Sequence, residues 1–198
     1  MSTYLRTARL TLRRLTADDL DNLVALDGDP AVMRYLTGGR PTPRAAMRSD
    51  LMDRLLPAYR RDPRFGRWAA EVGGVFAGWF ALWVPDGADG RDVELGYRLR
   101  RAAWGAGLAT EGCRALVHRA LHGYRVDRVW AQTMAVNTAS RRVMAKAGLA
   151  YVRTFHLDWD EPIDGAEHGE VEYERRAARS PRVAAGAPVG VPRRGATS

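Results

Sequence analysis

The first third of the chain carries one strand pattern followed by three helix patterns. Leucines alternate with polar residues over positions 10–15, and this period of two predicts a strand. Positions 16–19 (TADD) are typical of a helix start, because a threonine precedes two acids of the first turn. Asp-Pro at 29–30 and Thr-Pro at 42–43 predict two further helix starts, since proline fits the first helical position, and the last of these helices is expected to reach about Tyr59. The apolar residues at helical spacing are Leu20, Leu23, Val24, Val32, Met33, Leu36, Met47, Leu51 and Leu55.

The remaining chain has mainly strand patterns, with two helices between them. Two apolar runs at 68–72 and 75–84 are joined by Gly73-Gly74, which predicts a hairpin. Helix patterns between the later strands imply a crossover connection. We therefore expect an α/β (α+β) fold in a single domain over residues 1–176, with a mixed central sheet of about six to seven strands and flanking helices. The later strands are expected at 93–99, 129–133, 151–157 and 171–173, and the helices at 107–121 and 137–147.

Composition restricts the class of protein. Of 198 residues, 46% are hydrophobic and 27% charged, as in an ordinary globular domain. The one cysteine, Cys113, excludes an internal disulfide framework and is expected to be a buried apolar residue. His118 and His122 are four positions apart but lack further ligands at suitable spacing, so we expect no metal. No apolar run approaches the roughly 18 residues of a membrane span, and no secretory signal is visible, so a cytoplasmic protein without membrane contact is expected.

The net charge of +8 is distributed unevenly. Residues 177–198 contain four arginines and no acid, in an Ala/Gly/Pro/Val-rich composition that predicts a disordered tail. Residues 154–174 contain eight acids and neither lysine nor arginine. This layout favours a basic body that holds an anionic small molecule beside an acidic rim, which would favour a cationic acceptor unless the acidic stretch is simply a solvated loop. No nucleic-acid recognition motif accompanies the charge, so we expect no nucleic-acid partner.

The most informative stretch runs from the strand at 93–99 into a glycine-containing loop that opens a helix. Glycines at 105 and 107 let the backbone approach a ligand closely, and the first helical turn offers unpaired N–H groups to an anion. The Lys-Ser/Thr of a nucleotide-binding P-loop is missing. The spacing also differs from a dinucleotide fingerprint, whose third small residue comes one position later. Gly-x-Gly-x-Ala instead fits the diphosphate of coenzyme A, although a connection that binds nothing remains an alternative.

Several segments together resemble the GCN5-related N-acetyltransferase (GNAT) superfamily, in its RimJ/RimL-like branch of ribosomal-protein-alanine acetyltransferases. The similar segments follow the family's order over about residues 3–176. They are residues 5–13 (LRTARLTLR), 94–97 (ELGY), 104–111 (WGAGLATE), 137–144 (NTASRRVM) and 165–173 (GAEHGEVEY).

The resemblance implies a GNAT fold and an acetyl-CoA-dependent N-acetyltransferase, with acetyl-CoA as acyl donor and no metal. The acceptor would be a primary amine, on a peptide N-terminus or a small molecule, attacked directly in a ternary complex by a monomer or homodimer. A backbone N–H near Leu99 would face the thioester oxygen, and Ser140 would lie near the sulfur as proton donor. The cofactor-binding residues would be Tyr97, Leu99, Arg100, Trp104, Gly105, Ala106, Gly107, Leu108, Ala109, Thr110, Asn137 and Arg142.

Glu94 is the candidate general base, acting directly or through water. Its strand neighbours Val93 and Leu95 are apolar, and burial would raise its pKa toward a useful range. A pair with Arg98 is the structural alternative, just as Asn137 has an alternative role as helix N-cap. Three tryptophans on the hairpin, Trp68, Trp79 and Trp83, are expected in the core, although one of them would suit an acceptor pocket.

Two other functions stay open at this point. The chain would also fit an acyltransferase of the same fold that detoxifies small molecules or antibiotics. A catalytically silent acyl-CoA-binding module would share the loop and lack the transfer step.

Overall fold

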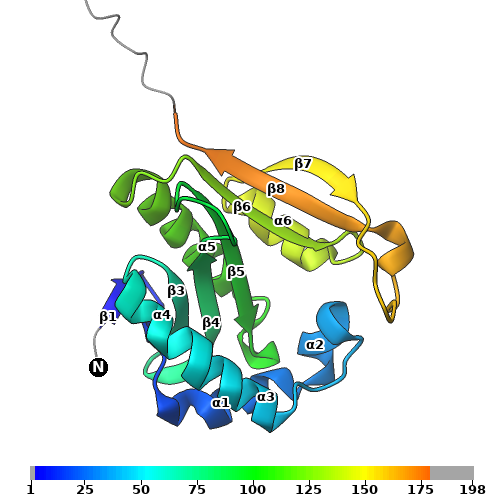
Figure 1. The fold of residues 1–198 in the computed structure, drawn as a ribbon, viewed down its shortest axis with the longest axis horizontal. Helices are drawn as coiled ribbons and strands as arrows, with labels where there is room; N and C mark the ends of the chain where they lie inside the picture. Colours follow the sequence, from blue (N-terminus) through cyan, green and yellow to red (C-terminus); the bar gives the residue numbers. More distant parts are fainter. Residues whose placement is uncertain (1–2, 179–198) are drawn as a thin grey trace, which may run out of the picture.

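An eight-stranded mixed sheet is the centre of the structure, a computed structural model that describes residues 3–178. The strands lie in the order β1-β2-β3-β4-β5-β6-β8-β7, and only β5 and β6 are parallel neighbours (Figure 1). The expected class of fold is confirmed, with eight strands in place of six to seven. Residues 179–198, most of the predicted tail, lie outside the described residues. The strands are β1 Thr3–Arg6, β2 Thr11–Arg14, β3 Gly66–Val72, β4 Val75–Trp83, β5 Asp92–Leu99, β6 Arg128–Met134, β7 Ala150–Phe155 and β8 Glu170–Arg176.

Helices cover both faces of this sheet (Figure 1). On β4, Phe80 and Leu82 belong to the core under α5 and α6, whereas Trp79 and Ala81 belong to the core under α1 and α3. This alternation follows from the period of two along a strand. The α-helices are α1 Leu20–Asp27, α2 Pro30–Thr37, α3 Arg44–Ser49, α4 Leu56–Arg61, α5 Leu108–His118 and α6 Thr138–Lys146. No helix within residues 3–178 is long and apolar enough to cross a bilayer.

The N-terminal segment differs from its sequence pattern, since it forms two strands rather than one. The Thr7 N–H donates to the Leu10 carbonyl at 2.9 Å, which closes a turn between β1 and β2. Leu5 then lies opposite Leu12 in the antiparallel pair. A short turn of this kind has weak sequence signals, because threonine, alanine and arginine are not strong turn formers.

Two predicted helix boundaries are also wrong. The third helix begins at Arg44, and Thr42 does not cap it: the threonine hydroxyl donates to Asp27 at 3.0 Å. The helix predicted at 107–121 ends as an α-helix at His118 and continues as a wider π turn, Arg119–Gly123. A second π turn, Asp50–Leu55, joins α3 to α4. Side-chain periodicity does not report such local widening of a helix.

The parallel pair β5–β6 is short. Its register covers only Asp92–Glu94 on β5 and Arg128–Trp130 on β6. Beyond Glu94, β5 continues against β4 as far as Leu99, and β6 continues against β8 as far as Met134. The two strands therefore diverge in the middle of the sheet (Figure 1).

Candidate active site

The loop after β5 ends in a helix start that is open to a ligand. Gly105 and Gly107 have φ values of +75° and +77°, a left-handed conformation that favours glycine. No heavy atom lies within 4 Å of the position that a Cβ at Gly105 would take. The Glu111 N–H makes the first helical bond, to the Gly107 carbonyl at 3.0 Å, so the N–H groups of residues 107–110 have no helical acceptor. These groups and the positive end of α5 could hold an anion.

A pocket of about 860 Å³ lies beside this helix start. The cofactor-binding residues expected from the sequence do not include the three cationic residues of this pocket, Arg9, Arg114 and Lys146. Arg9 comes from the turn between β1 and β2, Arg114 from α5 and Lys146 from α6, so only the folded chain brings them together. The lining residues are Thr7, Ala8, Arg9, Gly107, Thr110, Glu111, Arg114, Ala115 and Lys146.

The backbone of β5 has a free edge next to this loop. The Arg100 N–H donates to the Ala77 carbonyl at 2.9 Å, and Leu99 lies opposite Gly78 in the register. In an antiparallel pair this makes Leu99 a non-hydrogen-bonded partner, so its own N–H and carbonyl point away from β4. Tyr97 is likewise a non-hydrogen-bonded partner in the pair with β4. Both residues follow Glu94, the last residue of β5 that pairs with β6, so their outward backbone groups have no strand partner on that side. The Trp104 indole N–H donates to the Leu99 carbonyl at 2.8 Å, which leaves the Leu99 N–H on the open edge.

Tyr97, Ser140 and Asn137 lie together between β5 and the start of α6. The Tyr97 hydroxyl is 2.8 Å from the Ser140 hydroxyl and donates to the Ser140 carbonyl at 3.1 Å. Burial raises the pKa of Tyr97, so its hydroxyl stays protonated. The Asn137 side chain accepts from the Ser140 N–H at 3.2 Å, which confirms Asn137 as the N-cap, and its amide donates to Thr133.

Glu94 lies on the other face of the sheet from Tyr97. The Trp83 indole N–H donates to its carboxylate at 2.7 Å, and Trp130 is its register partner on β6. Burial raises the pKa of Glu94, while the Trp83 hydrogen bond opposes that shift. Gly96 allows this arrangement, because a Cβ there would lie 2.7 Å from the Trp83 ring. The predicted alternative is wrong: Arg98 pairs with the buried Asp27 rather than with Glu94.

Several candidate residues lie away from this group. The Arg100 guanidinium donates to Asn22 on α1 at 2.9 Å and lies over the Phe76 ring, and the exposed Arg142 has no hydrogen bond or ion pair within residues 3–178. Their contact with phosphates stays a prediction. Cys113 is buried as expected, and burial raises its pKa. In the described part of the chain, no group of three His, Cys, Asp or Glu residues could hold a metal ion.

Three of the eight acids in residues 154–174 pair with arginines, so part of the expected acidic rim is neutralised. Glu172 pairs with Arg128 and Arg153, and Glu174 pairs with Arg128 and Arg176. Glu161 pairs with Arg40, and Ile163 lies against Gly38, so the β7–β8 loop touches the turn after α2 (Figure 1).

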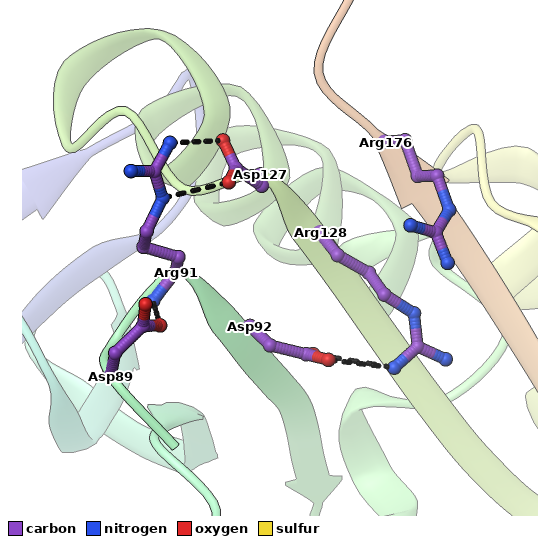
Figure 2. A pocket seen from close by; sticks show the side chains of 6 residues that line it. All are labelled: Asp89, Arg91, Asp92, Asp127, Arg128 and Arg176. Atoms are coloured by element: carbon purple, nitrogen blue, oxygen red, sulfur yellow. Dashed lines mark hydrogen bonds and ion pairs between the residues drawn. The ribbon is translucent and has the colours of Figure 1, made fainter.

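A second pocket, of about 450 Å³, lies at the starts of β5 and β6, the opposite end of these strands from the glycine loop. Figure 2 shows its charges facing one another: Arg91 contacts Asp127, and Arg128 contacts Asp92 at 3.0 Å. Arg176, also at this pocket, pairs with Glu174. Since these three arginines all pair with carboxylates, they do not by themselves point to a ligand.

Comparison with known proteins decides the family. Residues 9–150 match the description "Acetyltransferase (GNAT) domain". The chain belongs to the GNAT acetyltransferase family. It is 37% identical over 176 residues to the FsC-acetyl coenzyme A-N(2)-transacetylase of Aspergillus fumigatus. The aligned region covers 85% of this chain and 74% of the relative. The chain is therefore an acyltransferase that uses acetyl-CoA to modify an amine.

Solved GNAT structures share the fold at low sequence identity. The ribosomal L7/L12 alpha-N-protein acetyltransferase RimL, in complex with coenzyme A, has a TM-score of 0.74 at 16% identity and covers 89% of this chain and 98% of its own. The aminoglycoside acetyltransferase AAC(6')-Ib, in complex with coenzyme A and kanamycin, has a TM-score of 0.66 at 18% identity. This match covers 84% of this chain and 94% of that chain. The left-handed glycines, the uncapped helix start and the free edge of β5 fit acetyl-CoA as acyl donor.

Proposed function

We propose that this GNAT enzyme acetylates a primary amine of a small molecule by direct attack within a ternary complex, with Glu94 as general base. One observation carries the proposal: Glu94 is half-buried and hydrogen-bonded by Trp83 at the point where β5 and β6 stop pairing. An amine must lose a proton to form an amide, and a carboxylate of raised pKa at the edge of the open strand is suited to accept it.

The residues that would hold acetyl-CoA follow from the site. Bound acetyl-CoA supplies the acetyl group as a thioester. The N–H groups of residues 107–110 would bind its diphosphate, with Arg114 and Lys146 adding positive charge at the adjoining pocket. The free backbone edge at Tyr97 and Leu99 would bind the pantetheine arm, and the Leu99 N–H would face the thioester oxygen as an oxyanion-type donor. The remaining proposed contacts come from Arg100, Trp104, Asn137 and Arg142.

Ser140 would return a proton to the leaving sulfur. Its hydroxyl lies 2.8 Å from that of Tyr97, and either hydroxyl can donate in this contact. When Tyr97 donates, the serine proton is free for the sulfur. Glu94 and Ser140 thus have separate tasks: Glu94 removes a proton from the amine, and Ser140 supplies one to the sulfur.

A small-molecule acceptor is favoured by the relative at 37% identity, the FsC-acetyl coenzyme A-N(2)-transacetylase, because its name locates the reaction at a numbered nitrogen, N(2). A peptide N-terminus is the second candidate, because RimL has the same fold, and it would place the chain in the RimJ/RimL-like branch. Trp83 and Trp130 beside Glu94 suit either acceptor as a protonated amine, since aromatic rings attract cations.

Purified protein tests these proposals directly. Thiol release from acetyl-CoA is measured with a panel of small-molecule amines and with peptides that have free N-termini, and calorimetry measures acetyl-CoA binding alone. We expect turnover of small amines, and a loss of about 100-fold in kcat/KM for Glu94→Gln, as for removal of a general base. Tight binding without turnover of any amine would instead indicate a silent binding module. Turnover of peptides alone would overturn the small-molecule proposal.

A further inference from the structure

Glu111, in the first turn of α5, is anchored by residues more than one hundred positions earlier in the chain. Its Oε1 accepts from the Thr7 hydroxyl at 2.6 Å and from the Arg9 backbone N–H at 2.9 Å. Its Oε2 accepts from Arg9 Nε at 2.7 Å and lies 2.6 Å from another guanidinium nitrogen of Arg9. Burial alone would raise the pKa of Glu111, but the donors from Thr7 and Arg9 lower it below its usual value. The carboxylate therefore stays charged and its oxygens are fully engaged.

The same arginine reaches the glycine loop. A third nitrogen of the Arg9 guanidinium donates to the Ala106 carbonyl at 2.8 Å. The Ala106–Gly107 peptide is planar and trans, so its carbonyl and the Gly107 N–H point in opposite directions. Because the Ala106 carbonyl points toward Arg9, the Gly107 N–H points away from Arg9. That N–H has no acceptor within the described residues, so it is free to bind an anion.

The loop has few means of holding this conformation itself. Residues 105–107 are Gly-Ala-Gly and are exposed, so no long side chain anchors them. Such a segment loses much conformational entropy when it becomes ordered, and that loss weakens binding unless the loop is already ordered. External hydrogen bonds secure the loop from both ends, from Trp104 to Leu99 and from Arg9 to Ala106.

We propose that Arg9 and Glu111 form a clamp that preorganises the diphosphate-binding loop for acetyl-CoA. They are positioning residues: Glu111 orients Arg9, and Arg9 orients the Ala106–Gly107 peptide. The inference rests on the proposed donor site and adds the residues that set its shape.

A direct role of the Arg9 charge makes a different prediction. Arg9 is half-exposed and lines the pocket, so its guanidinium is also placed to attract a phosphate. If attraction were its whole role, Glu111→Ala would remove a negative charge from the pocket and bind acetyl-CoA as tightly as the wild type or more tightly. The clamp predicts weaker binding, because Arg9 would lose its orientation.

The test measures acetyl-CoA affinity by calorimetry and acetyl transfer by steady-state kinetics for Arg9→Ala, Glu111→Ala and the double variant. If each single change leaves the loop ordered in roughly a tenth of molecules, Kd and KM for acetyl-CoA rise about ten-fold while kcat changes little. The double variant is expected to be no worse than either single one, since both remove the same clamp. Arg6→Ala is the matched control: Arg6 is exposed on β1, and its side chain has no hydrogen bond or ion pair in the described part of the chain.

Thr7→Val provides a second variant in case Glu111→Ala destabilises α5. It removes the hydrogen bond to Glu111 and also the acceptor of the Leu10 N–H in the turn between β1 and β2. A rise in Kd smaller than that of Glu111→Ala, measured well below the Tm of the variant, supports the clamp. Wild-type affinity in both Arg9→Ala and Glu111→Ala would overturn it, as would tighter binding in Glu111→Ala. If the wild type itself binds no acetyl-CoA, the proposed donor site fails; if it binds and the variants bind equally well, only the clamp fails.

Discussion

The Tyr97 hydroxyl lies 2.8 Å from the Ser140 hydroxyl and joins the middle of β5 to the start of α6. This contact crosses the region where β5 and β6 diverge, and it fixes the serine side chain that we propose as proton donor. The Asn137 cap holds the backbone of the same serine at 3.2 Å. The proposed donor is therefore held through both its side chain and its backbone.

Tyr97→Phe is expected to lower kcat about ten-fold with little change in KM for acetyl-CoA, because one buried hydrogen bond of about 1.4 kcal/mol is lost while the strand edge is retained. Steady-state kinetics measure both constants. Ser140→Ala is the companion variant, and the double variant should have a kcat close to that of the weaker single variant. If the fall in kcat of the double variant equals the product of the two single falls, the hydroxyls act independently.

Trp83→Phe is expected to move the acid limb of the kcat/KM profile to higher pH. Glu94 must be ionised to accept a proton, so activity falls as the pH drops through its pKa. The Trp83 hydrogen bond favours the ionised form and holds down a pKa that burial raises. Its removal therefore raises the pKa further. An unmoved limb would contradict the assignment of Glu94 as base.

Gly96→Ala is expected to lower both activity and stability. The new Cβ would lie 2.7 Å from the Trp83 ring, so the indole must shift and its bond to Glu94 must weaken. Overpacking of this kind costs roughly 1–3 kcal/mol in the free energy of unfolding. Chemical denaturation measures that loss beside kcat/KM. Gly123→Ala is the control, since the nearest neighbour of its Cβ would lie at an ordinary contact distance of 3.7 Å. Equal losses of stability and kcat/KM in the two variants would contradict the close contact argued for Gly96.

Glu170→Gln is expected to stabilise the protein at pH 7.5 by about 1 kcal/mol. Glu170 is 6% exposed, its side chain has no hydrogen bond or ion pair within residues 3–178, and burial raises its pKa. The wild type therefore loses stability as the pH rises from the usual glutamate pKa through the raised one. The advantage of glutamine should disappear near pH 4, where the carboxyl is protonated in both folded and unfolded chains.

Urea denaturation at the two pH values measures this difference. Glu172→Gln is the matched control on the same strand, because Glu172 pairs with Arg128 and Arg153. Its loss should destabilise the protein at pH 7.5. A destabilised Glu170→Gln at that pH would mean that the Glu170 carboxylate has a favourable partner.

The sequence predicts the parts of this site that depend on local chain order. The glycines after β5, the helix start at 108 and the cap at Asn137 each follow from residues within a few positions of one another. The β5–α5–β6 crossover is local in the same sense, and it is confirmed.

Contacts set by strand register were not predictable. Trp83 meets Glu94 because β4 and β5 align with this offset, and a shift of one residue would turn either side chain to the other face. Arg98 finds Asp27 at the end of α1 instead of its strand neighbour Glu94, because α1 packs on that face. Thr7 and Arg9 reach Glu111 only after β1 and β2 fold back on each other, a turn with no strong sequence signal.

The alternation of side chains along β5 has one more consequence. Glu94 and the Tyr97–Ser140 pair stand on opposite sides of a layer one strand thick, with packed helices on each side. The proposed acceptor and donor of protons therefore approach a substrate between β5 and β6 from opposite faces of the sheet.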